Sequence, residues 1–295
     1  KLARKYGIRP IIGCEVYVAP GSRTEKSSSH GISDAAYHLT LLAKDLTGYH
    51  NLVKLVSRGY LEGFYYKPRI DKELLNQHAD GLIALSGCLK GEVNRLLVQG
   101  QQERAWEVAG HYREIMGPEN FYLEIQDQGL EEQRRIRAEL VALSHRLEVP
   151  LVATNDCHYL ESTDARAHEI LLGIQTGKTL QDTQRMRFSS DQFYFRSPDE
   201  MASIFQEIPQ ALTLTREIGE RCELELKFDE THLPRYQVPP GHSLESYLEE
   251  LAIRGLEKRL GEQTSHLRAE DYEKRLRYEL QVIQEMGYAG YFLIV

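Results

Sequence analysis

The 295-residue chain has few cysteines and no excess of positive charge. Its four cysteines, Cys14, Cys88, Cys157 and Cys222, are widely scattered, which is typical of reduced thiols in a cytosolic protein rather than of a disulfide framework. Acidic residues outnumber basic ones by 44 to 36, and the net charge is −8. Proteins that grip nucleic acid mainly through its phosphates are usually basic. The main DNA-binding surface is therefore not expected in this segment.

Long apolar runs and several well-known motifs are also missing. No apolar stretch of about 18 residues occurs, so no membrane-spanning helix is expected, and no secretory signal is recognisable. Glycine-rich nucleotide-binding motifs, HExxH and GxSxG are absent. We therefore expect a cytoplasmic protein without a membrane partner. Its first residues read as the end of a helix, and its last, "GYFLIV", as an unpaired apolar strand, so we expect a piece of a longer chain.

Strand-like and helix-like segments alternate through the first two thirds of the chain. This alternation predicts an α/β fold with a parallel sheet, either open or closed into a (β/α) barrel. In such a barrel the chemistry lies at the C-terminal ends of the strands and in the loops that follow them. Strands are expected at 11–18, 37–43, 81–87, 121–126 and 150–156, a polar loop at 21–36, and helices at 48–63, 71–80, 91–116, 131–149 and 163–177.

The pattern changes after about residue 178. Residues 192–205 are predicted to form a strand followed by a helix. Segment 231–243 contains Pro and Gly and is the best boundary candidate. We therefore expect one domain over 1–230, a linker over 231–243 and a helical segment over 244–295.

Asp156 and His158 follow the apolar segment 151–154 and are two positions apart. Zn²⁺ and similar ions take His nitrogen, Cys sulfur and carboxylate oxygen, and side chains spaced by two on an extended backbone point to the same side. The pair is therefore a candidate metal site. A capping Asp and a loop His without metal fit the motif equally well.

Three further residues are candidates on weaker grounds. Glu15 lies in an otherwise apolar strand, where a bare buried carboxylate is costly, so it is metal-bound, paired or facing water. Cys88 precedes a helix whose N-terminus would lower the pKa of the thiol, although a small core residue is the simpler interpretation. His38 stands at the start of its strand rather than at its end, which favours a structural role.

Glu124 and His168 are the remaining candidates, and simpler readings are favoured for both. Glu124, in "FYLEIQ", is a carboxylate of the site, a carboxylate that supports the site's ligands or, more simply, one half of an ion pair. His168 and its neighbour Glu169 are expected to pack or to lie on a helix surface rather than to bind metal.

Seven segments follow one another along the chain: "KPRIDKELL", "GLIALSGCLKGE", "FYLEIQ", "ATNDCHYL", "DARAHEILLGIQTGK", "RFSSDQFYF" and "MGYAGYFLIV". In this order they resemble the alpha subunits of bacterial DNA polymerase III, the C-family replicative polymerases. Together they span essentially the whole chain and match the N-terminal polymerase-and-histidinol-phosphatase (PHP) domain and the entry to the polymerase palm. The resemblance implies an incomplete, distorted (β/α) barrel of PHP type, followed by a mostly helical segment that leads into the palm.

The resemblance also implies a cluster of divalent metal ions, zinc or manganese, in the PHP domain. The family builds it from ligands in the order His, His, Asp, His, Glu, His, Cys, Asp and His. The first four, in an HxH and a TDH motif, would lie upstream of Lys1. The later positions match Glu15, His38, Cys88, Asp156 and His158.

The function implied by the resemblance is DNA-directed DNA polymerisation with a PHP 3′–5′ exonuclease. The magnesium-binding carboxylates of the polymerase would lie beyond Val295, so the segment alone is expected neither to polymerise nor to cut DNA. The implied partners are primer-template DNA held by downstream domains, the sliding clamp, the clamp loader and a proofreading subunit. Two alternatives stay open: an inert PHP scaffold that supports the polymerase or binds a proofreading partner, and a stand-alone metal-dependent phosphoesterase.

Overall fold

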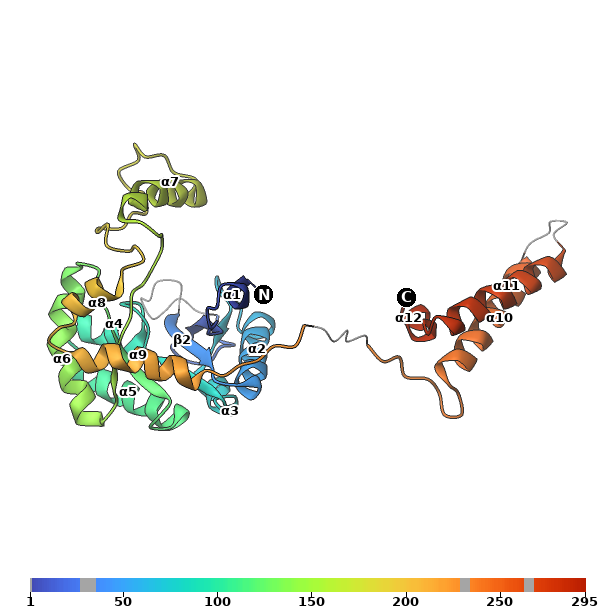
Figure 1. The fold of residues 1–295 in the computed structure, drawn as a ribbon, viewed down its shortest axis with the longest axis horizontal. Helices are drawn as coiled ribbons and strands as arrows, with labels where there is room; N and C mark the ends of the chain where they lie inside the picture. The colour runs from blue at the N-terminus through green and yellow to red at the C-terminus, as the bar shows by residue number, and fades with distance from the viewer. Residues whose placement is uncertain (1, 27–35, 229–233, 263–267) are drawn as a thin grey trace. The chain divides into compact units, whose positions relative to one another are not determined.

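The chain is described by a computed structural model over residues 2–26, 36–228, 234–262 and 268–295. It divides into two compact units, Lys1–Leu226 and Lys227–Val295. The first is an α/β unit and the second is helical (Figure 1). No helix in the described ranges is long and apolar enough to cross a membrane.

Two predicted segments lie partly outside the described residues. They are the polar loop at 21–36 and the linker at 231–243. The domain limits proposed from the sequence therefore stay a prediction.

A six-stranded sheet with the order β3-β1-β2-β4-β5-β6 forms the centre of the first unit. Strand β2 runs antiparallel to both of its neighbours, whereas the other three pairings are parallel. The α/β class is confirmed, but the prediction of a parallel sheet was wrong for β2. Parallel neighbours need a crossover connection, and the sequence between the first two strands is a polar loop. The strands are β1 (Gly13–Val18), β2 (Tyr37–Ala43), β3 (Arg69–Ile70), β4 (Leu82–Leu85), β5 (Phe121–Ile125) and β6 (Leu151–Ala153).

The two halves of the sheet differ in burial. In β2, Leu39 and Leu41 are buried in the main core, whereas His38 and Thr40 face the other side and are only half-buried. Strands β4, β5 and β6 are buried along their whole length, as strands covered on both faces are. A second, smaller apolar cluster covers their other face and includes Ile218. One face of β2, with His38 and Thr40, is therefore left partly exposed.

Most predicted helices are confirmed, and two of them begin directly after an aspartate that caps the first turn. Asp45 and Asp71 cap the first turns of α2 and α3 by accepting from Gly48 N and Leu74 N, each at 2.9 Å. The helices of this unit are α1 (Leu2–Lys5), α2 (Leu46–Leu61), α3 (Lys72–Gln77), α4 (Glu92–Val98), α5 (Gln102–Met116), α6 (Glu131–Leu147), α7 (Ala165–Thr176), α8 (Pro198–Ile204) and α9 (Pro209–Arg221), with a short 3₁₀ turn η2 (Ser162–Asp164) before α7.

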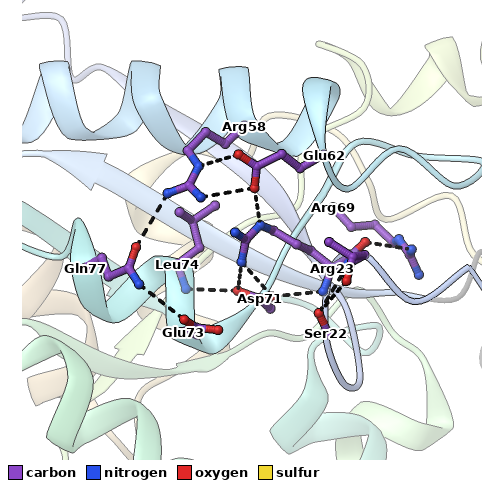
Figure 2. A network of polar contacts seen from close by, with 10 residues as sticks. Ser22, Arg23, Arg58, Glu62, Arg69, Asp71, Glu73, Leu74 and Gln77 are labelled. Atoms are coloured by element: carbon purple, nitrogen blue, oxygen red, sulfur yellow. Dashed lines mark hydrogen bonds and ion pairs between the residues drawn. The ribbon is translucent and has the colours of Figure 1, made fainter.

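A polar network, called here the Arg23 network, ties the segment after β1 to α2 and α3. It consists of Arg23, Arg58, Glu62, Arg69 and Asp71, and Figure 2 shows Arg23 between the two carboxylates. Arg23 lies 2.7 Å from Glu62 and 3.0 Å from Asp71. Arg69 donates to the Arg23 carbonyl at 3.2 Å. Every carboxylate of this network therefore faces a guanidinium group.

The second unit consists of α10 (Leu244–Glu262), α11 (Ala269–Glu285) and α12 (Ala289–Ile294). The final "GYFLIV" was predicted to be a strand and lies instead in and around the helix α12. Aromatic and β-branched residues favour strands, but contacts with α10 override that preference: Ala289 is buried, and a Cβ at Gly290 would lie 3.5 Å from the Leu244 side chain. Similarly, the strand predicted at the start of 192–205 is reduced to a single bridge between Tyr159 and Tyr194.

Candidate metal centre

The direction of β2 brings its first residues to the edge of the sheet at which β4 ends. Because β2 is antiparallel to β4, its start lies beside the C-terminal end of that strand. His38 pairs in register with Tyr17 of β1. Glu15, two residues before Tyr17 in β1, lies on the same face of the sheet. The position of His38 at the start of its strand, which seemed to count against it, is thus what places it at the site.

Glu15, His38 and Cys88 converge so closely that one ligand atom from each lies within 4.8 Å of the others. His38 Nδ1 lies 3.1 Å from Glu15 Oε1 and 3.8 Å from Cys88 Sγ. An edge-to-face contact with Tyr17, with ring centroids 5.2 Å apart, orients the imidazole. One oxygen, one nitrogen and one sulfur donor therefore face a common point.

The loop after β4 places Cys88 against β2. His38 N donates to Lys90 O at 3.1 Å, which fixes the loop on the start of β2. Gly87 has φ +85°, and a Cβ there would lie 2.8 Å from His38 O; a Cβ at Gly91 would lie 2.1 Å from Ser86 O. Only glycine fits these two positions, so the "SGCLKG" sequence is what allows the thiol to reach the imidazole.

Asp156 and His158 lie at the end of β6, as expected, but they face each other rather than the other three residues. His158 Nδ1 lies 3.7 Å from Asp156 Oδ1 and 3.1 Å from the Asp156 carbonyl. The backbone N–H of His158 donates to Phe193 O at 2.8 Å, and its ring contacts Phe188 and Phe193 edge to face.

All five residues line one cavity of about 310 Å³. Two exposed cations, Lys90 and Arg187, line it too, together with the apolar rings of Phe188 and Phe193. Sequence reasoning missed the two cations because single Lys and Arg residues carry no spacing signal. The only sequence clue was that Lys90 and Arg187 fall in two of the segments that carried the family resemblance.

The ionisable groups of the cavity are shifted in different directions. The hydrogen bond from His38 lowers the pKa of Glu15. Burial raises the pKa of Asp156 and raises that of the Cys88 thiol to about 11. The expected lowering of the Cys88 pKa by a helix N-terminus was wrong, because α4 begins only at Glu92 and burial dominates.

Glu124 is not one half of an ion pair in the described part of the chain. It is only 5 % exposed and accepts hydrogen bonds from Gly87 N, Gln126 Nε2 and the Thr154 hydroxyl. It does not line the cavity. His168 does not line it either, and its ring packs against those of His158 and Phe188; Glu169 pairs with Arg166 at 2.6 Å.

Comparison with protein families gives two matches along the chain. Residues 1–128 match the PHP domain. Residues 246–295 match the bacterial DNA polymerase III alpha NTPase domain. The PHP match includes Glu15, His38 and Cys88 and ends before Asp156.

Curated relatives align with the whole chain. It is 45 % identical to DNA polymerase III subunit alpha of Treponema pallidum and 41 % identical to that of Borreliella burgdorferi, covering 100 % of this chain and 25 % of each relative. It is 38 % identical to the subunit of Thermus aquaticus, covering 29 % of it. The chain thus spans about a quarter of the length of these relatives. Along its whole length it is similar to bacterial DNA polymerase III alpha subunits, and its residues 1–128 match the PHP domain.

Proposed function

We propose that the cavity is a metal centre that hydrolyses phosphodiesters, as a 3′–5′ exonuclease within a replicative DNA polymerase. The observation that carries this proposal is the convergence of Glu15, His38 and Cys88 within 4.8 Å. Asp156 and His158, on the wall of the same cavity, would complete the part of the ligand set that this chain supplies.

The donors fit zinc or manganese. Zinc takes thiolate, imidazole and carboxylate together, and manganese takes the oxygen and nitrogen donors. A bound ion would supply Lewis-acid polarisation of a phosphoryl oxygen and a water of lowered pKa. Cys88 must lose its proton to bind as thiolate, whereas the lowered pKa of Glu15 favours the charged form that a metal needs.

The remaining cavity residues suit a phosphodiester. Lys90 and Arg187 would hold non-bridging phosphate oxygens, and Arg187 can do so with two parallel donors. Phe188 and Phe193 form an apolar wall that would limit the access of bulk water.

The relatives are named as polymerase subunits, so we propose that the chain acts within a DNA-directed DNA polymerase. Primer-template DNA, the sliding clamp, the clamp loader and a proofreading subunit would be partners of that larger protein, and magnesium would serve its polymerase site outside this segment. The segment alone is expected not to extend a primer. Nucleotide incorporation by the purified chain would contradict this.

An inert scaffold is the second candidate function. It is favoured by one observation: Asp156 and His158 contact each other and do not join the other three ligand candidates. A stand-alone phosphoesterase is less consistent with the match of residues 246–295 to a polymerase domain.

Metal content separates these functions. Inductively coupled plasma mass spectrometry of the purified chain should find zinc or manganese, and Cys88→Ser together with His38→Ala should remove it. If the chain and the full-length protein that contains it both hold no metal, the scaffold function is favoured. If the full-length protein holds metal, release of 3′ nucleotides from labelled single-stranded DNA is the next assay.

A further inference from the structure

Glu124 is a buried carboxylate in a strand whose other residues are apolar. Strand β5 reads Phe-Tyr-Leu-Glu-Ile, and all five residues are buried. Burial raises the pKa of Glu124, so the position is costly for a charged group unless donors compensate it. An aliphatic side chain would fill the same place in the sheet without that cost. Sheet packing alone therefore does not account for a carboxylate here.

The partners of Glu124 come from the two loops that carry candidate metal ligands. Gly87 N, directly before Cys88, donates to Oε2 at 3.0 Å. The Thr154 hydroxyl, two residues before Asp156, donates to Oε1. Gln126 Nε2 donates to Oε1 at 2.9 Å and to Thr154 Oγ1 at 3.0 Å. All three groups bonded to the Glu124 carboxylate donate to it, so they favour its charged form and oppose the rise in pKa that burial causes.

The same two loops are tied to β5 a second time. The backbone N–H of Glu124 donates to Ser86 Oγ at 2.8 Å, and Thr154 N donates to Ile125 O at 3.1 Å. Gly87, held from one side by Glu124, has His38 O on its other side, 2.8 Å from where a Cβ would lie. A movement of the Glu124 carboxylate would therefore be transmitted to Cys88 and to Asp156 together.

We propose that Glu124 is a positioning residue, which holds the Gly87–Cys88 loop and the Thr154–Asp156 segment in the arrangement that binds metal, without touching the ion. The inference rests on the proposed metal centre. Groups that orient metal ligands from behind typically contribute 10–100-fold to metal affinity. Glu124→Gln keeps the size of the side chain but turns an NH₂ group toward donors, so at least one of the three hydrogen bonds is lost.

The test is a titration of the metal-free 295-residue chain with Co²⁺, in which the absorption spectrum of the cobalt complex is recorded after each addition. The parent chain should show a thiolate-to-cobalt band from Cys88. Glu124→Gln should weaken Co²⁺ binding about 10–100-fold and alter the d–d bands, because the ligand geometry changes. Asp71→Asn is the matched control, because it also alters a buried carboxylate with three donors, outside the cavity; it should leave both readouts unchanged.

Thr154→Val, which removes one donor and keeps the side-chain shape, covers the case in which Glu124→Gln does not fold; it should weaken Co²⁺ binding by a smaller factor. If Glu124→Gln and Thr154→Val bind Co²⁺ as tightly as the parent chain with the same spectrum, the inference is overturned and the metal centre stands. If the parent chain shows no thiolate-to-cobalt band, the metal centre itself falls, and this inference falls with it.

Discussion

The Arg23 network and the metal cavity are both built from charged side chains, but their charges are arranged differently. In the Arg23 network, Arg58 and Arg23 meet Glu62, and Arg23 meets Asp71, at 2.7 to 3.0 Å. In the cavity, Glu15 pairs with His38 and Asp156 with His158. Lys90 lines the cavity without an ion pair to a described carboxylate.

This difference separates a structural polar cluster from a candidate binding site. Buried charges are stable where each is paired and hydrogen-bonded, and Arg23, Glu62 and Asp71 meet that condition within the Arg23 network. In the cavity the two carboxylates pair with imidazoles instead of guanidinium groups, and a metal cation from solution can use the same donor atoms. The comparison predicts that changes in the first cluster reduce stability, whereas changes in the second reduce ligand binding.

The largest expected effect follows from removing Asp71. Asp71→Ala leaves the Arg23 side chain, which is only 12 % exposed, without the more deeply buried of its two carboxylate partners. Breaking a buried pair costs about 3–5 kcal/mol, so urea denaturation should show a loss of that size in the free energy of unfolding, with metal content unchanged. Arg216→Ala is the control, because its pair with Glu220 is exposed and should contribute about 0.5 kcal/mol or less. Equal losses in the two variants would contradict the structural role of the network.

The second-largest effect is expected in the cavity, where a substitution should reduce metal binding and leave stability nearly unchanged. Cys88→Ser removes the sulfur donor and should lower zinc affinity by at least about 100-fold, the upper range for residues that only orient ligands. The metal-free protein should change its free energy of unfolding by about 1 kcal/mol or less. Competition with a chromogenic chelator measures the affinity. Cys157→Ser, at an exposed cysteine outside the cavity, should bind zinc normally; a similar loss there would point to non-specific thiol binding.

Part of the fold and of the site could be predicted from the sequence, and part could not. Most strand and helix segments and the five cavity residues follow from apolar periodicity and the family motifs, since each depends on a short stretch of sequence; the final "GYFLIV", predicted as a strand and found in a helix, is an exception. The direction of β2 does not follow from these patterns, because it depends on a loop connection rather than on periodicity. Because β2 is antiparallel to β4, His38 lies at the site although it stands at the start of its strand. Lys90 and Arg187 join the cavity only through tertiary contacts, and the partners of Glu124 come from strands and loops far apart in the chain.

A smaller effect is expected from pH. Burial raises the pKa of Cys88 from 9.0 to about 11, so below that value a metal must displace the thiol proton. Zinc affinity should therefore rise about tenfold per pH unit from about pH 7.5 to 9.5. The Cys88→Ser variant should lose this slope. In the metal-free protein the sign is opposite: the raised pKa contributes stability below about pH 9 that is lost as the pH rises through 11. Isothermal titration calorimetry with zinc at several pH values measures the first slope, and urea denaturation of the metal-free protein at the same pH values measures the second.

The smallest effect is expected for Arg187. This exposed residue lines the cavity, so its substitution should reduce ligand binding rather than stability. Arg187→Ala removes one phosphate contact, so it should weaken binding of single-stranded DNA several-fold and lower the slope of log K against log salt by about 0.7. Fluorescence anisotropy at several salt concentrations measures both. Arg216→Ala removes an equal charge far along the chain on α9 and, because it lies outside the cavity, should leave binding unchanged. If both variants lose the same affinity, the loss reflects net charge, and the cavity has no specific phosphate contact at Arg187.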